Sequence, residues 1–238
     1  MENKYTKDTK EEFEMLMKTI CVITIGQTPR TDMIPPLKSY LPNDTRIIEK
    51  GVLDSLSIEE IQNLCVEDGQ TTLVSRLKNG KSVVVSKEKV IPIIQKLIDE
   101  CQKTEIDLIL LACTGKFPFF LSEIPVIYPD FLLNYAVKGL LREGKLGVIV
   151  PLIQQSEMIS DKWNEVDFKT YITSTSPYDG SHEEFVQATK RINESQVQAI
   201  LLDCMGYSNE MKNIIREHTN KPIIIARNII YANLAELL

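Results

Sequence analysis

The chain has 238 residues, of which 43% are hydrophobic and 25% charged, and its formal net charge is −6. This length supports one large domain or two small ones, and the composition excludes disordered and fibrous proteins. The acidic balance argues against nucleic acid as a partner, because phosphate binding needs a basic surface. No apolar run approaches the roughly 20 residues of a membrane helix, so we expect no membrane partner.

Residues 1–18 are rich in Lys and Glu and lack the apolar core of a signal peptide. We expect this charged leader to be a frayed helix or a tail, and we expect the protein to be cytoplasmic.

After the leader, strand and helix patterns alternate almost to the end of the chain. In the first half, the predicted elements are a strand at 19–25, a helix capped by Thr31 or Asp32 and ending near Leu41, a strand at 47–51, a helix from the capping box at 57–60 to about Val66, two strands at 73–77 and 81–85, a helix from Ser86 to about Lys103, and a strand at 107–112. In the second half they are a short helix after Pro118, strands at 124–128, 146–150, 169–174, 199–202 and 222–226, and helices at 131–142, from 156 onwards, and at 181–194, 209–218 and 228–238. The alternation predicts an α/β fold with mainly parallel sheets. The strands around Asn79-Gly80 predict a local β-hairpin.

Two segments of the chain look like copies of one another. Residues 110–115 read Leu-Leu-Ala-Cys-Thr-Gly, and residues 201–206 read Leu-Leu-Asp-Cys-Met-Gly. Each segment predicts a buried strand that ends in a cysteine and a glycine turn. Since open α/β sheets bind ligands at the carboxyl ends of their strands, Cys113 and Cys204 suggest one site built from both halves of the chain.

The other three cysteines lack this shared context. Cys21 lies in an apolar strand, Cys65 on a predicted amphipathic helix and Cys101 near a helix end, so we interpret all three as packing residues. No two cysteines have C-x-x-C spacing, and no cluster of His, Asp or Glu has metal-ligand spacing. We therefore predict no metal and no cofactor.

Two facing thiols suit proton transfer at one carbon atom, because one thiolate can remove a proton and the other thiol can return one from the opposite face. The backbone amides of the two turns suit an anion such as a carboxylate. These amides belong to Thr114, Gly115, Met205 and Gly206. The alternative stays open, because a cysteine that ends an apolar strand often serves packing, and helix capping could produce Cys-x-Gly twice.

The loop after the first strand, residues 26–30, offers a candidate carboxylate ligand. Arg30 could bind a carboxylate with two nitrogens or be an ordinary surface arginine. The loop lacks both glycine-rich phosphate motifs. Four further side chains have alternative interpretations: Arg76 and Arg227 (weak anion binders, or solvated or structural), Asp203 (orienting a group or capping the next helix) and Tyr207 (closing a pocket or packing).

These residues resemble a known family. The segments at 24–30 (Thr-Ile-Gly-Gln-Thr-Pro-Arg), 109–111, 147–151 and 201–206 resemble the AroM family, and the resemblance covers about residue 19 to the end of the chain. The family is linked by name to aromatic amino-acid metabolism, which by itself implies little chemistry.

More distantly, the layout is similar to the cofactor-independent aspartate/glutamate racemase superfamily, whose members have two similar α/β lobes with one cysteine from each at the cleft. Cys113 and Cys204 match these two positions. The resemblance implies a first lobe at residues 19–127 and 222–238 and a second at 128–221. The residues that follow each cysteine are not those usual in racemases, and the first loop has Gln27 and Thr28 in place of Asp-Ser, which leaves the substrate open.

We therefore predict two pseudo-symmetric α/β lobes with a cleft that holds Cys113 and Cys204 as a catalytic acid–base pair. The leading hypothesis is a cofactor-independent racemase- or isomerase-like enzyme that acts on a small carboxylate, bound by the turn amides with Gln27, Thr28 and Arg30. The alternatives are a non-catalytic binder of a small anionic metabolite and a structural partner protein with a vestigial cleft. A homodimer is left open.

Overall fold

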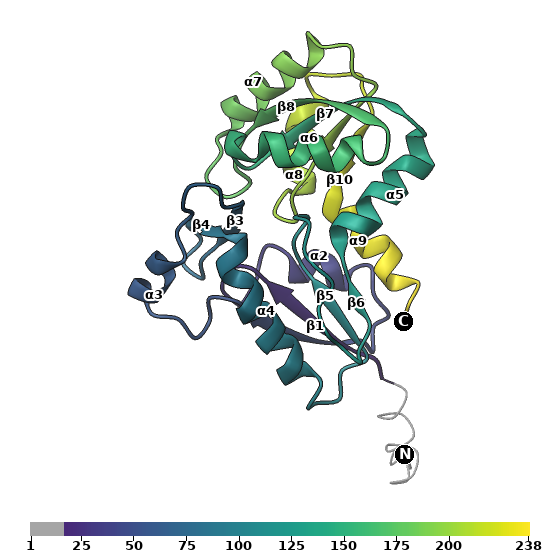
Figure 1. The fold of residues 1–238 in the computed structure, drawn as a ribbon. Coiled ribbons are helices and arrows are strands. Elements are labelled where there is room, and N and C mark those ends of the chain that lie inside the picture. Colours follow the sequence, from purple (N-terminus) through teal and green to yellow (C-terminus); the bar gives the residue numbers. More distant parts are fainter. Residues whose placement is uncertain (1–16) are drawn as a thin grey trace, which may run out of the picture.

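The computed structural model describes residues 17–238, so residues 1–16 of the predicted leader lie outside the described part. Two four-stranded sheets and one two-stranded sheet form the framework of the described residues. The two large sheets belong to two lobes, one above the other in Figure 1.

The first sheet contains four parallel strands in the order β2-β1-β5-β6. Their bounds are β1 Thr19–Thr24, β2 Arg46–Gly51, β5 Leu108–Leu111 and β6 Val126–Ile127. The helices of this half are α2 Ile34–Lys38, α3 Ile58–Asn63 and α4 Lys87–Cys101. Between α3 and α4, the strands β3 (Thr72–Arg76) and β4 (Ser82–Ser86) pair antiparallel around Asn79-Gly80, as predicted.

The second sheet also contains four parallel strands, in the order β8-β7-β9-β10. Their bounds are β7 Gly144–Val150, β8 Phe168–Ser174, β9 Ala199–Leu202 and β10 Ile223–Ile225. The helices of this half are α5 Pro129–Leu141, the short 3-10 helix η1 Ile153–Gln155, α6 Ser156–Asn164, α7 His182–Asn193, α8 Asn209–Arg216 and α9 Ala226–Ala235. Most of these bounds differ from the predicted ones by only a few residues.

The two sheets share one layout. When β2-β1-β5-β6 is laid against β8-β7-β9-β10, β1 corresponds to β7 and β5 to β9. Both β5 (Leu-Ile-Leu-Leu) and β9 (Ala-Ile-Leu-Leu) are buried along their whole length, as expected for parallel strands covered on both faces. The carboxyl ends of these two strands, where Cys113 and Cys204 follow, therefore occupy matching places in the two lobes.

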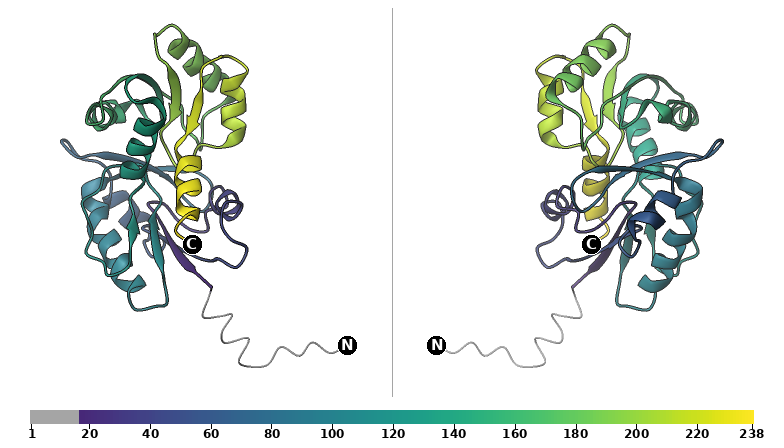
Figure 2. Two further views of the ribbon diagram at one scale, coloured as in Figure 1. Left: turned by 90° about the vertical axis from the view of Figure 1, so that its right-hand side faces the viewer. Right: turned by 90° about the vertical axis from the view of Figure 1, so that its left-hand side faces the viewer.

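One apolar core joins the lobes. It includes Leu110 from β5, Val148 from β7, Leu201 from β9 and Ile230 from α9. Figure 2 shows the chain's last helix, α9 (yellow), reaching from the upper sheet down beside the first lobe. There the Tyr231 hydroxyl donates to a backbone carbonyl of the first lobe at 3.3 Å. The lobe boundaries at residues 128 and 222 stay a prediction.

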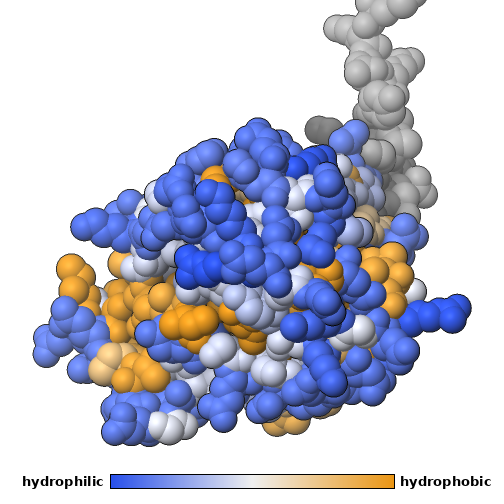
Figure 3. Space-filling model, turned by 90° about the horizontal axis from the view of Figure 1, so that it is seen from above, coloured by the Kyte–Doolittle hydropathy of each residue, from blue (hydrophilic) through white to orange (hydrophobic). Residues whose placement is uncertain are grey.

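Seen from above in Figure 3, the molecule is mostly hydrophilic, with apolar side chains gathered in a few places. None of the helices in residues 17–238 has the length and apolar character needed to cross a bilayer.

The predicted helix after Pro118 is wrong, because residues 117–125 contain no helix. Side chains from other elements take up the backbone N–H groups of this segment. The N–H of Phe120 donates to the Tyr128 hydroxyl at 2.7 Å, and that of Leu121 donates to Gln95 at 3.0 Å. These tertiary partners replace the i−4 carbonyls that a helix would need.

Two other helix predictions are wrong in detail. Neither Thr31 nor Asp32 caps α2, which begins after Met33, and the Asp32 carboxylate binds Arg30 instead. The helix ends at Lys38 rather than near Leu41. The Ser57 capping box is present, but α3 ends at Asn63.

Cys65, expected to be a packing residue, is exposed, because α3 ends two residues before it and does not carry it into the core. The other two cysteines interpreted as packing residues are buried. Cys21 and Cys101 lie with their sulfurs 3.3 Å apart.

The shared core predicts that both lobes unfold together. Leu110→Ala and Leu201→Ala remove fully buried side chains from the two matching strands, and each is expected to lower the free energy of unfolding by about 2–5 kcal/mol. Denaturant unfolding followed by circular dichroism should show a single transition in both variants. The matched control is Leu140→Ala in α5, where the side chain is 62% exposed and the change should stay within about 0.5 kcal/mol. Two separate transitions would contradict the shared core.

Candidate functional site

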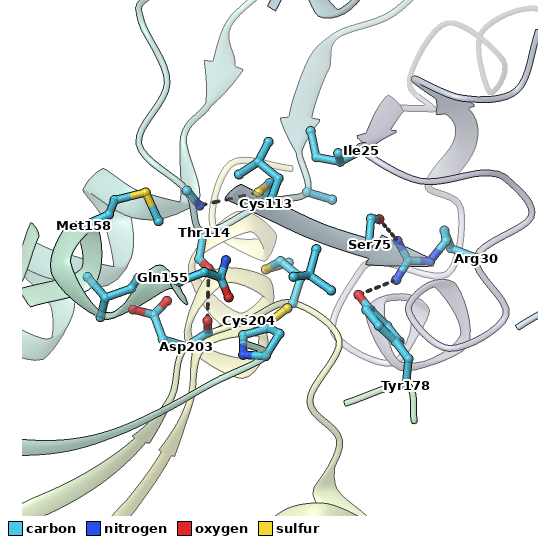
Figure 4. A pocket seen from close by; sticks show the side chains of 17 residues that line it. Ile25, Arg30, Ser75, Cys113, Thr114, Gln155, Met158, Tyr178, Asp203 and Cys204 are labelled. Atoms are coloured by element: carbon cyan, nitrogen blue, oxygen red, sulfur yellow. Dashed lines mark hydrogen bonds between the residues drawn. The ribbon is translucent and has the colours of Figure 1, made fainter. Parts of the chain in front are cut away.

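The two repeated cysteines meet at one cavity between the lobes. Cys113 follows β5, Cys204 follows β9, and both are half-buried and line the cavity drawn in Figure 4. The cavity volume is about 30 Å³, which has room for about two water molecules. Both lobes supply its walls, through Ile25, Arg30, Leu73, Val74, Ser75, Thr114 and Gly115 on one side and Pro151, Gln155, Met158, Tyr178, Asp203 and Met205 on the other.

Each cysteine sulfur is held in the same backbone turn. The N–H of Gly115 donates to the sulfur of Cys113 at 3.4 Å, and the N–H of Gly206 donates to the sulfur of Cys204 at 3.4 Å. A backbone donor aimed at sulfur favours a thiolate over a thiol. The sequence repeat is thus a repeat of local geometry, with the donor two residues after each cysteine.

The residue between each cysteine and its glycine leaves a backbone donor free. The N–H groups of Thr114 and Met205 meet no acceptor among residues 17–238. Unpaired N–H groups beside a cavity are rare in folded proteins and are suited to an anionic oxygen. That these two residues bind an anion stays a prediction.

Both thiols are protonated at neutral pH in the closed cavity. Burial raises the pKa of Cys113 to about 12, against a partial offset from the Gly115 N–H, and the neighbouring Cys204 raises it further. Burial also raises the pKa of Cys204, while the Gly206 N–H and the charge of Arg30 act in the opposite direction. A reaction that uses a thiolate therefore requires the cavity to open to water or a ligand.

A buried ion pair joins the two cysteine loops. The ammonium of Lys162, on α6, lies 2.7 Å from the carboxylate of Asp203 and 3.2 Å from the carbonyl oxygen of Thr114. The indole N–H of Trp163 donates to the same carboxylate oxygen at 3.0 Å. The Lys162 and Asp203 side chains are only 3% and 0% exposed. Asp203 is therefore bound to Lys162 and Trp163, and the alternative that it caps the next helix is wrong because Ser208 caps α8.

Arg30 is buried and fully engaged, so the alternative of an ordinary surface arginine is wrong. Its Nε and Nη2 atoms bind the two carboxylate oxygens of Asp32 at 2.9 and 2.7 Å. Burial opposes the charge of Arg30, but the hydrogen bonds to Asp32 outweigh it and raise the arginine pKa. The remaining contacts of Arg30 are to Thr24, to Ser75 and, at 3.3 Å, to the Tyr178 hydroxyl.

Comparison with known proteins identifies the family. A family model described as AroM protein matches residues 20–238. This chain belongs to the AroM family. No protein with a curated description matches it.

The AroM chain also shares its fold with solved structures. A liganded double variant of arylmalonate decarboxylase matches with a TM-score of 0.60 and 14% identity, over 93% of this chain and 92% of that one. Aspartate racemase from Picrophilus torridus matches with a TM-score of 0.57 and 14% identity, over 92% and 94% of the two chains. Glutamate racemase from Francisella tularensis, in complex with D-glutamate, matches with a TM-score of 0.58 and 18% identity, over 93% and 81%. At these identities the likeness shows the fold, and it confirms the predicted racemase-like α/β architecture.

Some of the predicted site residues of this AroM protein lie away from the cavity. The side-chain amide of Gln27 donates to the Leu53 carbonyl and accepts from the Lys78 N–H. Thr28 donates to the Asp54 carboxylate through its N–H and its hydroxyl. Gly206 faces a neighbouring groove rather than the cavity. The remaining predicted residues line the cavity: Arg30, Cys113, Thr114, Gly115, Cys204 and Met205. Their roles stay a prediction.

The three weaker candidates serve structure. Tyr207 is fully buried and its hydroxyl donates to the Thr175 carbonyl at 2.8 Å, so it packs rather than closes the pocket. Arg76 lies 3.3 Å from an oxygen of Asp32, and Arg227 donates to the Asp32 carbonyl at 3.0 Å.

Several cavity residues were absent from the sequence prediction. Tyr178 follows β8 and Gln155 follows β7, so inspecting every loop at a strand's carboxyl end would have found both. The hairpin strand β3 also lines the cavity, and Gln155 bonds the Thr72 carbonyl at 3.3 Å. No signal of this kind marks Lys162. Within residues 17–238, no three His, Cys, Asp or Glu side chains are grouped so as to hold a metal ion.

The buried ion pair should dominate the stability of the site. Lys162→Met leaves the Asp203 carboxylate buried without its cation, and we expect a loss of about 3–5 kcal/mol in the free energy of unfolding. Denaturant unfolding measures this loss.

The matched control is Lys116→Met, because Lys116 pairs with Glu165 at 2.8 Å while both side chains are more than half exposed. Its loss should be at most about 1 kcal/mol. Equal, small losses in the two variants would show that Lys162 does not hold the cysteine loops together.

Proposed function

We propose that this AroM-family protein is a cofactor-independent, racemase- or isomerase-like enzyme that acts on a small carboxylate, with Cys113 and Cys204 as its acid–base pair. The observation that carries the proposal is the matched pair of thiols. Each follows the corresponding strand of its sheet, each accepts an N–H from the glycine two residues on, and both line one cavity.

The proposed reaction moves one proton on and one proton off the same carbon. A thiolate takes the proton next to the substrate carboxylate, and the bonding electrons move onto the carboxylate oxygens. The second thiol then returns a proton to the carbon from the opposite side, leaving its own sulfur as the thiolate. In this proposal, the free N–H groups of Thr114 and Met205 hold the negative oxygens while this charge develops.

Substrate entry requires the lobes to separate. A carboxylic acid with a reacting carbon is larger than the two waters that the closed cavity can hold. Two part-buried side-chain bonds cross the cavity, one of 3.3 Å from Gln155 to the Thr72 carbonyl and one of 3.3 Å from Arg30 to the Tyr178 hydroxyl, and both must break for it to open. Opening also admits water to the sulfurs, which lowers the pKa of both thiols from their buried values.

The similar structures support a small acid as substrate, since they are named for action on aspartate, glutamate or an arylmalonate. At 14–18% identity these activities come to this chain only as a proposal. The same cavity would serve a non-catalytic binder of a small anionic metabolite, and the experiment below separates the two.

The proposal predicts exchange of a carbon-bound proton with solvent. A panel of small carboxylic acids is incubated with the protein in deuterium oxide, and deuterium at the carbon next to the carboxylate is followed by NMR. At least one acid should exchange, and Cys113→Ala and Cys204→Ala should each slow that exchange about 100-fold or more. Cys65→Ala, which changes an exposed thiol outside the cavity, should exchange at the wild-type rate.

Exchange that persists in the Cys113→Ala, Cys204→Ala double variant would overturn the catalytic role of the pair. Saturable binding of an acid by calorimetry, with no exchange in the wild type, would identify a binder instead.

A further inference from the structure

The surroundings of the two cysteines differ although their turns match. Tyr178, from the loop after β8, lines the cavity with Cys204, and its hydroxyl lies 3.3 Å from a nitrogen of Arg30. The guanidinium also lies over the Tyr178 ring, 5.7 Å from its centre. Figure 4 shows this pair on the side of the cavity away from Cys113. Near Cys113, the corresponding charged groups are the buried carboxylate of Asp130, which opposes a thiolate, and the ammonium of Lys162, which favours one.

Tyr178 is fitted against the turn that follows Cys204. A Cβ atom placed on Gly206 would lie 2.7 Å from the Tyr178 hydroxyl oxygen and 2.8 Å from the ring carbons Cζ and Cε1. Only glycine therefore leaves room for the phenol at this turn. At the matching Gly115, the nearest atom is a methyl carbon of Leu73 at 3.1 Å, so the turn at Cys113 has no hydroxyl beside it.

The direction of the Tyr178 hydroxyl follows from its partner. Arginine has only donors, so the phenol oxygen accepts from Arg30 and its own hydrogen is free to point elsewhere. Burial raises the pKa of Tyr178, so this hydrogen stays on the oxygen at neutral pH. The phenol packs against the Gly206 turn that holds the Cys204 sulfur, so a hydrogen bond from the free hydroxyl hydrogen to Cys204 would favour the Cys204 thiolate.

We propose that Tyr178, oriented by Arg30, is a positioning residue that makes Cys204 the first of the two thiols to ionise once the cavity opens, and leaves Cys113 as the thiol. This inference deepens the proposed function and rests on it for its catalytic meaning. Cys204 then removes the substrate proton first and becomes a thiol, while Cys113 gives up its proton and becomes the thiolate. Exchange with solvent returns the pair to its resting state.

The other charged and titratable groups around Cys204 do not reverse this assignment. Asp203 opposes the thiolate, but its carboxylate is paired with Lys162 at 2.7 Å. The charge of a Cys204 thiolate also raises the pKa of Tyr207, but the Tyr207 hydroxyl donates its hydrogen to the Thr175 carbonyl. Arg30 keeps its charge through Asp32 and favours the thiolate.

The test is thiol labelling as a function of pH, which needs no substrate. Iodoacetamide reacts with thiolates, and peptide mass spectrometry reads Cys113 and Cys204 separately in one sample. The midpoint of each rate profile reports the thiol's ionisation, whereas the plateau reports its access. In the wild type, the Cys204 midpoint should lie below that of Cys113. Tyr178→Phe should raise the Cys204 midpoint and slow Cys204 labelling at pH 8 roughly tenfold or more, as expected for loss of a hydrogen bond to a charged group.

Two further variants keep the test decisive. Tyr207→Phe removes another buried hydroxyl and should leave the Cys204 profile unchanged. Gly206→Ala should displace the phenol and move the profile in the same direction as Tyr178→Phe. Labelling of the buried Cys21 reports any variant that unfolds.

A wild-type Cys113 midpoint below that of Cys204 would overturn the proposal, as would a Cys204 profile that neither Tyr178→Phe nor Gly206→Ala moves. A Tyr178 effect on labelling with no proton exchange in any acid would overturn the proposed function alone.

Discussion

The ammonium group of Lys162 bonds both cysteine loops at once, through the Thr114 carbonyl after β5 and the Asp203 carboxylate after β9. A buried charge of this kind is unfavourable unless it is paired and its hydrogen bonds are satisfied, and here Trp163 supplies a further donor to the same carboxylate. The pair therefore fixes the distance between two loops that come from different sheets. The position of each thiol, the free N–H groups beside them and the size of the cavity all depend on that distance.

The two sheets have the same strand order, which places the two cysteine turns symmetrically. The side chains from the surrounding loops differ between the two cysteines. The backbone surroundings of Cys113 and Cys204 are the same, since each sulfur accepts a hydrogen bond from the N–H of the residue two positions later. The surrounding side chains differ, with a guanidinium and a phenol near Cys204 and a carboxylate and an ammonium near Cys113. A pair of thiols that moves protons on one carbon needs both properties. Matching turns let the two sulfurs reach the same carbon from opposite sides, and different surroundings decide which sulfur is deprotonated first.

The alternating pattern and the repeated Leu-Leu-x-Cys-x-Gly segment were enough to predict the α/β lobes and the meeting of two thiols, because both depend on local periodicity and on where parallel strands end. Long-range contacts were not accessible in this way. Arg30 was left as either a carboxylate ligand or a surface arginine, because its contacts to Ser75 and Tyr178 come from far along the chain. One hydrogen bond of Gln27 likewise depends on the distant hairpin. Lys162 resembles any helix lysine in sequence, since its burial arises only from the packing of α6 between the two loops.

The central claim is that Cys113 and Cys204 face one another across a single cavity and act on one molecule. Bridging by dibromobimane tests it most directly, because both bromides must be displaced by neighbouring thiols to give one cross-link. With Cys65 replaced by Ser to remove the exposed thiol, the account predicts one intramolecular bridge between the Cys113 and Cys204 peptides, identified by mass spectrometry. Separate single-thiol adducts on the two peptides, with no bridged product, would contradict it.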